Sequence, residues 1–146
     1  QGAKRVRLID FDFDAKSLSE RIGRDGLPGV SDLLSAGGPV DEFFSSIAGT
    51  RIQFAPAGTA SLEQAVIRAE RVDSVLGGAQ DTLTIVDASA SSPIHLLVSH
   101  IDAVLFSVLD DAPRTPDEQR ALRCAREAGL PVWGVSPEKN QVFPLV

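Results

Sequence analysis

The stretch Arg5-Val6-Arg7-Leu8-Ile9-Asp10-Phe11-Asp12 decides the fold class, because a short β-rich apolar run ends in two aspartates. A buried parallel strand has this pattern, with polar groups first appearing at its carboxyl end. The pattern returns at residues 82–87, where Thr-Leu-Thr-Ile-Val is followed by Asp87. The two stretches predict two parallel strands, each with an aspartate at its carboxyl end.

The rest of the chain alternates between segments with helical periodicity and short apolar runs, with glycines at most of the boundaries. Such alternation predicts an α/β fold with a mostly parallel sheet and helices on both faces, a Rossmann-like three-layer sandwich. Ligands of such sheets bind outside the carboxyl ends of the strands. Helices are expected over residues 17–22, 31–36, 40–48, 61–76, 93–101 and 115–128, and further strands over 51–54, 103–109, 131–135 and 141–146.

Length and composition limit the classes of function. The 146 residues, 43% of them hydrophobic, are expected to form one domain, residues 1–146. With 14 Lys and Arg against 20 Asp and Glu, the net charge of -6 argues against a nucleic-acid partner. A single cysteine permits no internal disulfide and fits a reducing, cytoplasmic setting. Because the sequence contains no methionine, we expect it to be a piece of a longer protein.

The aspartates at the strand ends are the strongest candidates for chemistry. A parallel sheet brings Asp10, Asp12 and Asp87 to one edge, where clustered carboxylates suit Mg²⁺ and the positioning of a water or hydroxyl for phosphoryl transfer. The alternative is structural, since strand-end aspartates also cap the following helix or turn. Spacing alone leaves both interpretations open.

Other reactive side chains favour structural roles. His95 and His100 are five positions apart, so they do not share a helix face as paired metal ligands would. Cys124 has no acid–base partner nearby in the sequence and is expected to pack as a small apolar group. Trp133 lies in an expected core strand and is predicted to be buried.

Five short segments, taken in order, resemble the motifs of the deviant Walker ATPases. The first is residues 5–12 with Ser17-Leu18, similar to the second phosphate-site strand of that group, which reads as hydrophobic residues and then Asp-x-Asp. The others are Gly-Val-Ser-Asp-Leu-Leu at 29–34, Phe-Ala-Pro-Ala-Gly at 54–58, the Walker B-like Thr-Ile-Val-Asp at 84–87, and Asp-Ala-Val-Leu-Phe-Ser-Val at 102–108. The most similar subgroup is the cytoplasmic domains of bacterial tyrosine kinases and polysaccharide chain-length regulators. The wider group includes the MinD and ParA ATPases and pilus-assembly ATPase-like proteins.

This resemblance implies a P-loop NTPase-like fold and gives roles to the aspartates. Asp10 and Asp12 would be catalytic, positioning water or metal, and Asp87 with Asp12 would hold Mg²⁺, with Mg-ATP as the cofactor of an intact parent protein. The Gly-rich P-loop of the family would precede Gln1, and residues 26–29 lack the Lys that follows such a loop. We therefore expect this chain to lack its N-terminal strand, its P-loop and a complete nucleotide site, and to hold no cofactor by itself.

Three hypotheses for the function follow. The first is an ATPase-like cytoplasmic domain of a bacterial exopolysaccharide or capsule biosynthesis or export regulator. It would act at the inner face of the membrane through a membrane polysaccharide co-polymerase or a similar envelope protein, and could form homo-oligomers. The second is a non-catalytic interaction module, a pseudo-ATPase, of an envelope, pilus-assembly or partition system. The third is a receiver domain with Lys139 as its late lysine, but Asp12 and Asp87 are 75 positions apart, which is too long a spacing for that fold.

Overall fold

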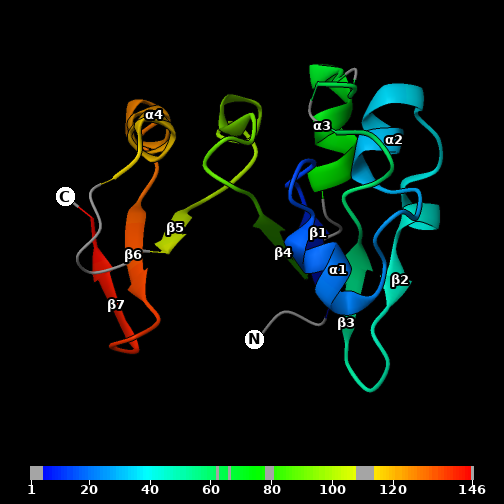
Figure 1. The fold of residues 1–146 in the computed structure, drawn as a ribbon, viewed down its shortest axis with the longest axis horizontal. Helices are drawn as coiled ribbons and strands as arrows, with labels where there is room; N and C mark the ends of the chain where they lie inside the picture. The colour runs from blue at the N-terminus through cyan, green and yellow to red at the C-terminus, as the bar shows by residue number, and fades with distance from the viewer. Residues whose placement is uncertain (1–4, 62, 66, 78–80, 108–113, 146) are drawn as a thin grey trace. The chain divides into compact units, whose positions relative to one another are not determined.

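The computed structural model describes residues 5–61, 63–65, 67–77, 81–107 and 114–145. They fall into two units, residues 1–92 and residues 93–146, and each unit has its own sheet. Figure 1 shows both units along the chain, and each is described here by itself. The expectation of one domain over residues 1–146 stays a prediction.

The first unit is built on a four-stranded sheet in the order β2-β3-β1-β4. The central strand β1 (Arg5–Asp10) pairs in parallel with β3 (Ile52–Ala55) and with β4 (Thr82–Asp87), while the short β2 (Ser45–Ser46) is antiparallel to β3 (Figure 1). Burial increases along β1 toward its carboxyl end, as expected for an apolar run flanked by strands on both sides. The carboxyl end of β1 therefore lies at the centre of the sheet edge.

Within the described residues, the α-helices of this unit are α1 (Ser17–Ile22), α2 (Val30–Ala36) and α3 (Ala69–Leu76). Apolar residues recur at helical spacing in α2 and α3, which pack on one another. The Phe11 and Phe13 rings, just beyond β1, lie 4.8 Å apart and are buried. The buried apolar side chains of this unit include Ile9, Phe11, Phe13, Val30, Leu33, Leu34, Phe54, Val72 and Val75.

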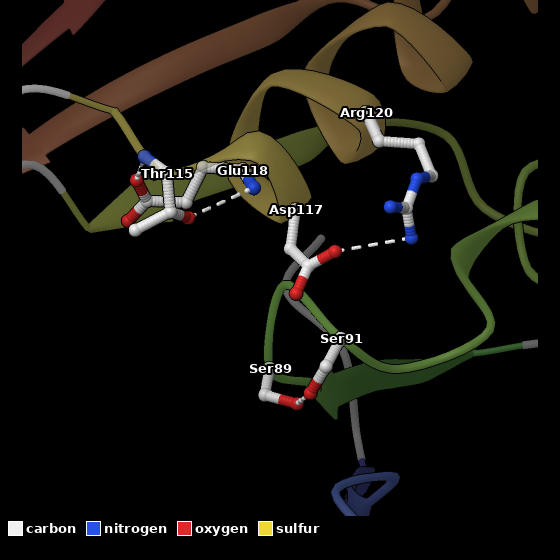
Figure 2. Close-up of polar contacts among 6 residues, drawn as sticks. All are labelled: Ser89, Ser91, Thr115, Asp117, Glu118 and Arg120. Carbon is white, nitrogen blue, oxygen red and sulfur yellow. Dashed lines mark hydrogen bonds and ion pairs between the residues drawn. The ribbon is translucent and has the colours of Figure 1, made fainter.

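The second unit contains the sheet β5-β6-β7 and the helix α4. Strand β6 (Val132–Ser136) is parallel to β5 (Val104–Ser107) and antiparallel to β7 (Gln141–Pro144). Helix α4 (Pro116–Glu127) begins with a reciprocal cap, in which Glu118 N donates to Thr115 Oγ1 at 3.2 Å and Thr115 N donates to Glu118 Oε2 at 2.6 Å (Figure 2). The same first turn carries an Asp117–Arg120 ion pair of 3.0 Å. The core of this unit combines Leu122, Ala125 and Val132 with Val104, Phe106 and Leu145.

The α/β class is confirmed, each expected strand has a counterpart among the described residues, and both sheets mix parallel with antiparallel pairs. Residues 108–109 of the strand expected over 103–109, and residue 146 of the strand expected over 141–146, lie outside the described residues. Three expected helices are wrong in whole or in part. Residues 40–48 contain a 3-10 helix, Val40–Phe43, followed by β2. The Phe44 ring lies under the Arg7 guanidinium, whose Cζ is 4.5 Å from the ring centroid. Residues 93–101 form only the 3-10 helix Ile94–Leu96, which packs on α4.

Helix α3 begins at Ala69 rather than at residue 61, and among the described residues before it Ala65 N donates to Ser61 O at 2.8 Å in a turn. Leu62 and Val66 of the helix expected over residues 61–76 lie outside the described residues. Trp133 is 39% exposed rather than buried. Strand β6 alternates, so buried Val132 lies on the opposite face of the sheet from Trp133. Among the described helices, none combines the length and apolarity needed to cross a bilayer.

Candidate functional site

The carboxyl ends of β1 and β4 meet at one edge of the first sheet, where Asp10 and Asp87 are register partners. Phe11, one residue beyond β1, donates its backbone N–H to the Asp87 carbonyl at 2.7 Å, which holds the two strand ends together. The structure therefore brings together the strand-end aspartates that the sequence analysis expected at one edge, while their chemical roles stay a prediction.

Asp10 is fully buried and its carboxylate is committed to the protein's own backbone and hydroxyl groups. Its Oδ1 accepts from Asp12 N at 3.0 Å, and its Oδ2 accepts from the N–H and the hydroxyl of Ser19 at 2.9 and 2.6 Å. Ser19 lies in the first turn of α1, whose N-cap residue Lys16 makes no side-chain cap. Asp10 thus supplies from the neighbouring strand the acceptor that a helix N-terminus requires.

Asp12 is only half-buried and lies in the turn between β1 and α1. Its Oδ1 accepts from Ala15 N at 3.2 Å, an Asx-type turn that fixes the side chain. Within the described part of the chain, Oδ2 of Asp12 accepts no hydrogen bond. One carboxylate oxygen at this edge is therefore held in place while the other remains available to a ligand.

Asp87 is exposed at the end of β4, and its carboxylate makes no hydrogen bond or ion pair within the described residues. Partial burial raises the pKa of the Asp87 carboxyl above its ordinary value of 3.8, and the charges of Asp10 and Asp12 raise it further. The Arg21 guanidinium lowers this pKa but does not compensate. This edge of the sheet therefore carries uncompensated negative charge, which a cation would relieve.

A serine cluster after β4 connects the two strand ends, which the sequence analysis did not predict. Ser92 Oγ donates to the Phe11 carbonyl at 3.1 Å and accepts from Ser89 N at 3.1 Å. The Ser89 and Ser91 hydroxyls lie 2.9 Å apart (Figure 2). These contacts hold the segment after β4 against the segment after β1, and so support the placement of Asp87.

Two motifs of the family resemblance to which the sequence analysis gave no chemical role, residues 29–34 and 54–58, are hydrogen-bonded to one another. The first amides of α2 donate to the loop after β3: Val30 N to Pro56 O and Ser31 N to Ala57 O, both at 2.9 Å. A Cβ on Gly29 would lie 2.0 Å from Pro56 O, so only glycine fits this approach. The order of the two motifs in the sequence was the available signal, but their contact required the structure.

Asp32 completes this contact. Its carboxylate accepts from Gly29 N at 2.8 Å, from Thr59 N at 2.9 Å and from the Thr59 hydroxyl. Burial alone would raise the pKa of the Asp32 carboxyl, but the hydrogen bonds from Thr59 and Gly29 outweigh it and lower the pKa below 3.8. We name the set Gly29, Ser31, Asp32, Pro56 and Thr59 the α2 clamp. It fixes the loop after β3 beside the carboxyl edge of the sheet.

Lys16 joins the clamp to the aspartate turn. It has a left-handed backbone, φ 50°, and its Nζ donates to Gly58 O at 2.9 Å. Ser19 makes a parallel connection, since its Oγ accepts from Ala57 N at 3.0 Å while donating to Asp10. The β1–α1 turn, the loop after β3 and the strand-end aspartates thus form one hydrogen-bonded assembly.

The donor chemistry of this edge fits Mg²⁺ with few protein ligands. No group of three or more His, Cys, Asp or Glu side chains within the described ranges is arranged to hold a metal ion. Mg²⁺ commonly binds one or two carboxylates and completes its shell with water and phosphate oxygens. Asp12 and Asp87 offer such carboxylates, whereas Asp10 has both oxygens engaged.

The comparisons with known proteins concern the fold. No protein-family model and no curated protein sequence matches the chain. Among solved structures, the VpsO kinase domain matches with a TM-score of 0.63 at 19% identity, over 90% of this chain and 68% of that one. MinD complexed with Mg-ADP from Pyrococcus horikoshii OT3 matches with a TM-score of 0.66 at 17% identity, over 92% of this chain and 58% of that one.

The BceF tyrosine kinase domain also matches, with a TM-score of 0.60 at 20% identity, over 86% of this chain and 52% of that one. The chain thus spans between 52% and 68% of the length of these three structures. Matches at such low sequence identity show that the fold is similar, and they do not show a shared activity or substrate. The resemblance to MinD-like ATPases and bacterial tyrosine kinase domains is confirmed at that level: the chain has a P-loop NTPase-like α/β fold.

Proposed function

We propose that this chain is part of an ATPase-like domain of a bacterial exopolysaccharide or capsule regulator, with its carboxyl sheet edge forming one wall of a Mg-nucleotide site. The observation that supports this proposal is the pairing of Asp10 with Asp87 in register, with Asp12 two residues beyond β1. The matched MinD structure was solved with Mg-ADP, and two of the matched structures are kinase domains.

In this proposal the three aspartates have different roles. Asp12, through Oδ2, and Asp87 would hold Mg²⁺, which would neutralise phosphate charge when bound. Asp12 would also orient a water or hydroxyl for attack. Asp10, which the sequence analysis placed among the catalytic residues, is here a positioning residue, because its carboxylate fixes Asp12 N and the first turn of α1.

The phosphate cradle would come from outside this chain. Backbone N–H groups of a Gly-rich loop usually supply it, with a Lys that reaches the β- and γ-phosphates. Residues 26–29, the Gly-Leu-Pro-Gly stretch, form a turn before α2, as the sequence predicts. Carboxylates repel phosphate, so the aspartate edge by itself favours the metal and not the nucleotide.

The partners in this proposal follow from the same resemblance. The domain would work at the inner, cytoplasmic face of the membrane by binding a membrane polysaccharide co-polymerase or a similar envelope protein. It would form homo-oligomers when the nucleotide is bound. In this proposal no nucleic-acid partner is expected, since the acidic net charge of -6 opposes binding to a phosphate backbone.

Calorimetric titration with Mg-ATP tests the nucleotide proposal. The chain alone should give no measurable heat at micromolar concentration, and a longer form that includes the residues upstream of Gln1 should bind. Asp87→Asn should weaken binding in that longer form, while Asp117→Asn, a surface carboxylate of α4, should not. Tight binding by this chain alone, or none by the longer form, would contradict the proposal.

A second function, the non-catalytic interaction module, is favoured by one observation. The Asp10 carboxylate accepts hydrogen bonds from Ser19 in α1. One of the two aspartates to which the resemblance gives a catalytic role therefore has a structural role. If the longer form binds no nucleotide yet still binds an envelope protein, this pseudo-ATPase function would replace the first.

A further inference from the structure

The hydroxyl of Ser92 connects the two chain segments that carry the candidate metal ligands. Ser92 is buried, and its Oγ donates to the Phe11 carbonyl at 3.1 Å. Phe11 immediately precedes Asp12, and its own N–H donates to the Asp87 carbonyl at 2.7 Å. The segment after β4 is therefore bound to the segment after β1 at two points, through the Asp87 backbone and through the Ser92 side chain.

The direction of the hydrogen bonds around Ser92 follows from the number of protons available. A carbonyl oxygen only accepts, so the one proton of the Ser92 hydroxyl lies in the bond to Phe11 O. Ser92 Oγ then accepts from Ser89 N at 3.1 Å and from the Ser89 hydroxyl at 3.0 Å. Since the Ser89 proton is used in that bond, the Ser91 hydroxyl donates to Ser89 Oγ, 2.9 Å away (Figure 2).

This order of protons excludes Ser92 as a metal ligand. A hydroxyl oxygen has two lone pairs, and both lone pairs of Ser92 Oγ accept from Ser89. Ser92 can therefore influence a cation only through the residues that it holds in place, which belong to the segments bearing Asp12 and Asp87. All of these contacts lie within the first unit, residues 1–92.

The separation of two carboxylate ligands matters more to Mg²⁺ than to larger cations. Mg²⁺ requires near-ideal octahedral geometry with oxygens at about 2.0–2.1 Å, whereas Ca²⁺ accepts flexible arrangements at about 2.3–2.6 Å. Asp12 is held by the bond from Ala15 N. The Asp87 carboxylate makes no hydrogen bond within the described residues, so its position depends on its backbone. Loosening the segment after β4 should therefore weaken Mg²⁺ binding more than Ca²⁺ binding.

We propose that Ser92 is a positioning residue of the metal site, whose hydroxyl sets the separation of Asp12 and Asp87 and so makes the site favour Mg²⁺ over Ca²⁺. This inference rests on the proposed function, because it takes the cation to lie between these two carboxylates. Removing a partner that orients metal ligands commonly weakens metal binding by about 10–100-fold. A site with few protein ligands should lie at the lower end of that range.

The affinity of the chain for three cations, measured without nucleotide, tests this role. Mn²⁺ broadening of the amide signals near Asp12 and Asp87 gives an apparent dissociation constant, and competition gives those of Mg²⁺ and Ca²⁺. In Ser92→Ala, binding of Mn²⁺ and Mg²⁺ should weaken about tenfold, and binding of Ca²⁺ by no more than about threefold. The ratio of the Ca²⁺ to the Mg²⁺ dissociation constant should therefore fall at least about threefold.

Thr50→Ala is the matched control. Thr50 makes the same pair of bonds as Ser92, since its Oγ1 donates to Ile47 O at 2.9 Å and accepts from Ile52 N at 3.1 Å. It precedes β3, which is parallel to β1, and so lies at the opposite end of the sheet from the aspartates. Thr50→Ala should lower the thermal midpoint, as Ser92→Ala does, and leave the ratio of the two dissociation constants unchanged.

A second variant keeps the test open if Ser92→Ala does not fold. Ser89→Ala removes one donor to Ser92 Oγ and leaves both the Ser89 N–H and the bond to Phe11 O in place. It should lower the same ratio by a smaller factor.

Two kinds of result would overturn the inference, and they are distinguishable. If the native chain binds Mn²⁺ between the aspartates but the serine variants leave the ratio unchanged, or Thr50→Ala lowers it equally, Ser92 has no positioning role and the metal site stands. If the native chain binds no cation there, the metal site of the proposed function fails and the inference fails with it.

Discussion

The Asp10 carboxylate in β1 accepts from both the backbone amide and the hydroxyl of Ser19 in α1, at 2.9 and 2.6 Å, and is fully buried. A helix whose N-cap residue makes no side-chain cap is thus capped by a strand-end aspartate nine positions earlier. Asp10 therefore makes the contacts of a structural cap, which was the alternative to a metal-binding role for the strand-end aspartates. Asp12 and Asp87 remain the candidate metal ligands.

Asp10→Asn should lower the stability of the chain. An asparagine has one acceptor oxygen and adds N–H donors that would face the Ser19 and Asp12 donors, and leaving buried donors unpaired costs about 1–3 kcal/mol. The midpoint of thermal unfolding should fall by about 2–4 °C per kcal/mol for a chain of this size.

The matched control for this loss is Asp12→Asn, because Asp12 is half-buried and accepts one hydrogen bond, from Ala15 N. It should change the midpoint much less. If the two variants unfold at the same temperature, Asp10 does not carry the cap.

Asp87→Asn should leave the thermal midpoint unchanged or raise it in metal-free buffer at neutral pH. The pKa of Asp87 is raised in the folded chain, so its ionised form is less favourable there than in the unfolded chain. The gain should be present at pH values above the raised pKa and should vanish as the pH falls below 3.8, where both states are protonated.

Thermal melts between about pH 3 and neutral pH, which span the ordinary pKa of an aspartate, would show this dependence. Millimolar Mg²⁺ should stabilise the native chain and not the variant. A fall of several degrees in metal-free buffer would instead assign Asp87 a capping role worth about 0.5–2 kcal/mol.

Asp32 should have the opposite pH dependence. Its pKa is lowered in the folded chain, so its contribution to stability is complete above 3.8 and is lost as the pH falls through the native pKa. Asp32→Asn should therefore lower the midpoint at neutral pH and have less effect in acid. An NMR titration of the Asp32 carboxyl carbon gives the pKa directly, and a value above 3.8 would contradict the hydrogen-bonding account of the α2 clamp.

Gly29→Ala should destabilise the chain by about 3 kcal/mol, the upper range for overpacking, because the new Cβ would lie 2.0 Å from Pro56 O. Gly26→Ala is the control, since Gly26 has a φ of +70° but open space around its Cβ position. It should cost about 1–2 kcal/mol from backbone conformation alone. Chemical denaturation gives both values, and equal losses would mean that the close approach of α2 to the loop after β3 adds nothing.

The sequence was sufficient to predict the strands that place the candidate site. Residues 5–12 and 82–87 are apolar runs ending in aspartate, and the period of such runs is a local property. The capping role of Asp10 was not predictable, because its contact with Ser19 depends on how α1 packs beside β1, which the local sequence does not determine. For the same reason, the short motifs at 29–34 and 54–58 could be recognised in order but not joined into the α2 clamp.

The elements that were predicted wrongly are those in which packing overrides local periodicity. The sequence before Ala69 has helical periodicity, yet the described residues of that segment include a turn at Ser61, and helix α3 begins only at Ala69. Trp133 was expected in the core because β6 is apolar, but alternation places it on the face away from Val132. Hydrophobicity identifies a strand and does not by itself identify the face that a helix covers.

The most direct test of the account is whether a divalent cation binds between Asp12 and Asp87. Mn²⁺ can replace Mg²⁺ at oxygen sites, and it broadens NMR signals near it. At millimolar Mn²⁺, we expect selective broadening of the amides around Asp12 and Asp87 that excess Mg²⁺ reverses, that Asp87→Asn removes, and that Asp117→Asn leaves unchanged. Broadening centred elsewhere, or unchanged in Asp87→Asn, would contradict the proposed metal site at the carboxyl edge of β1 and β4.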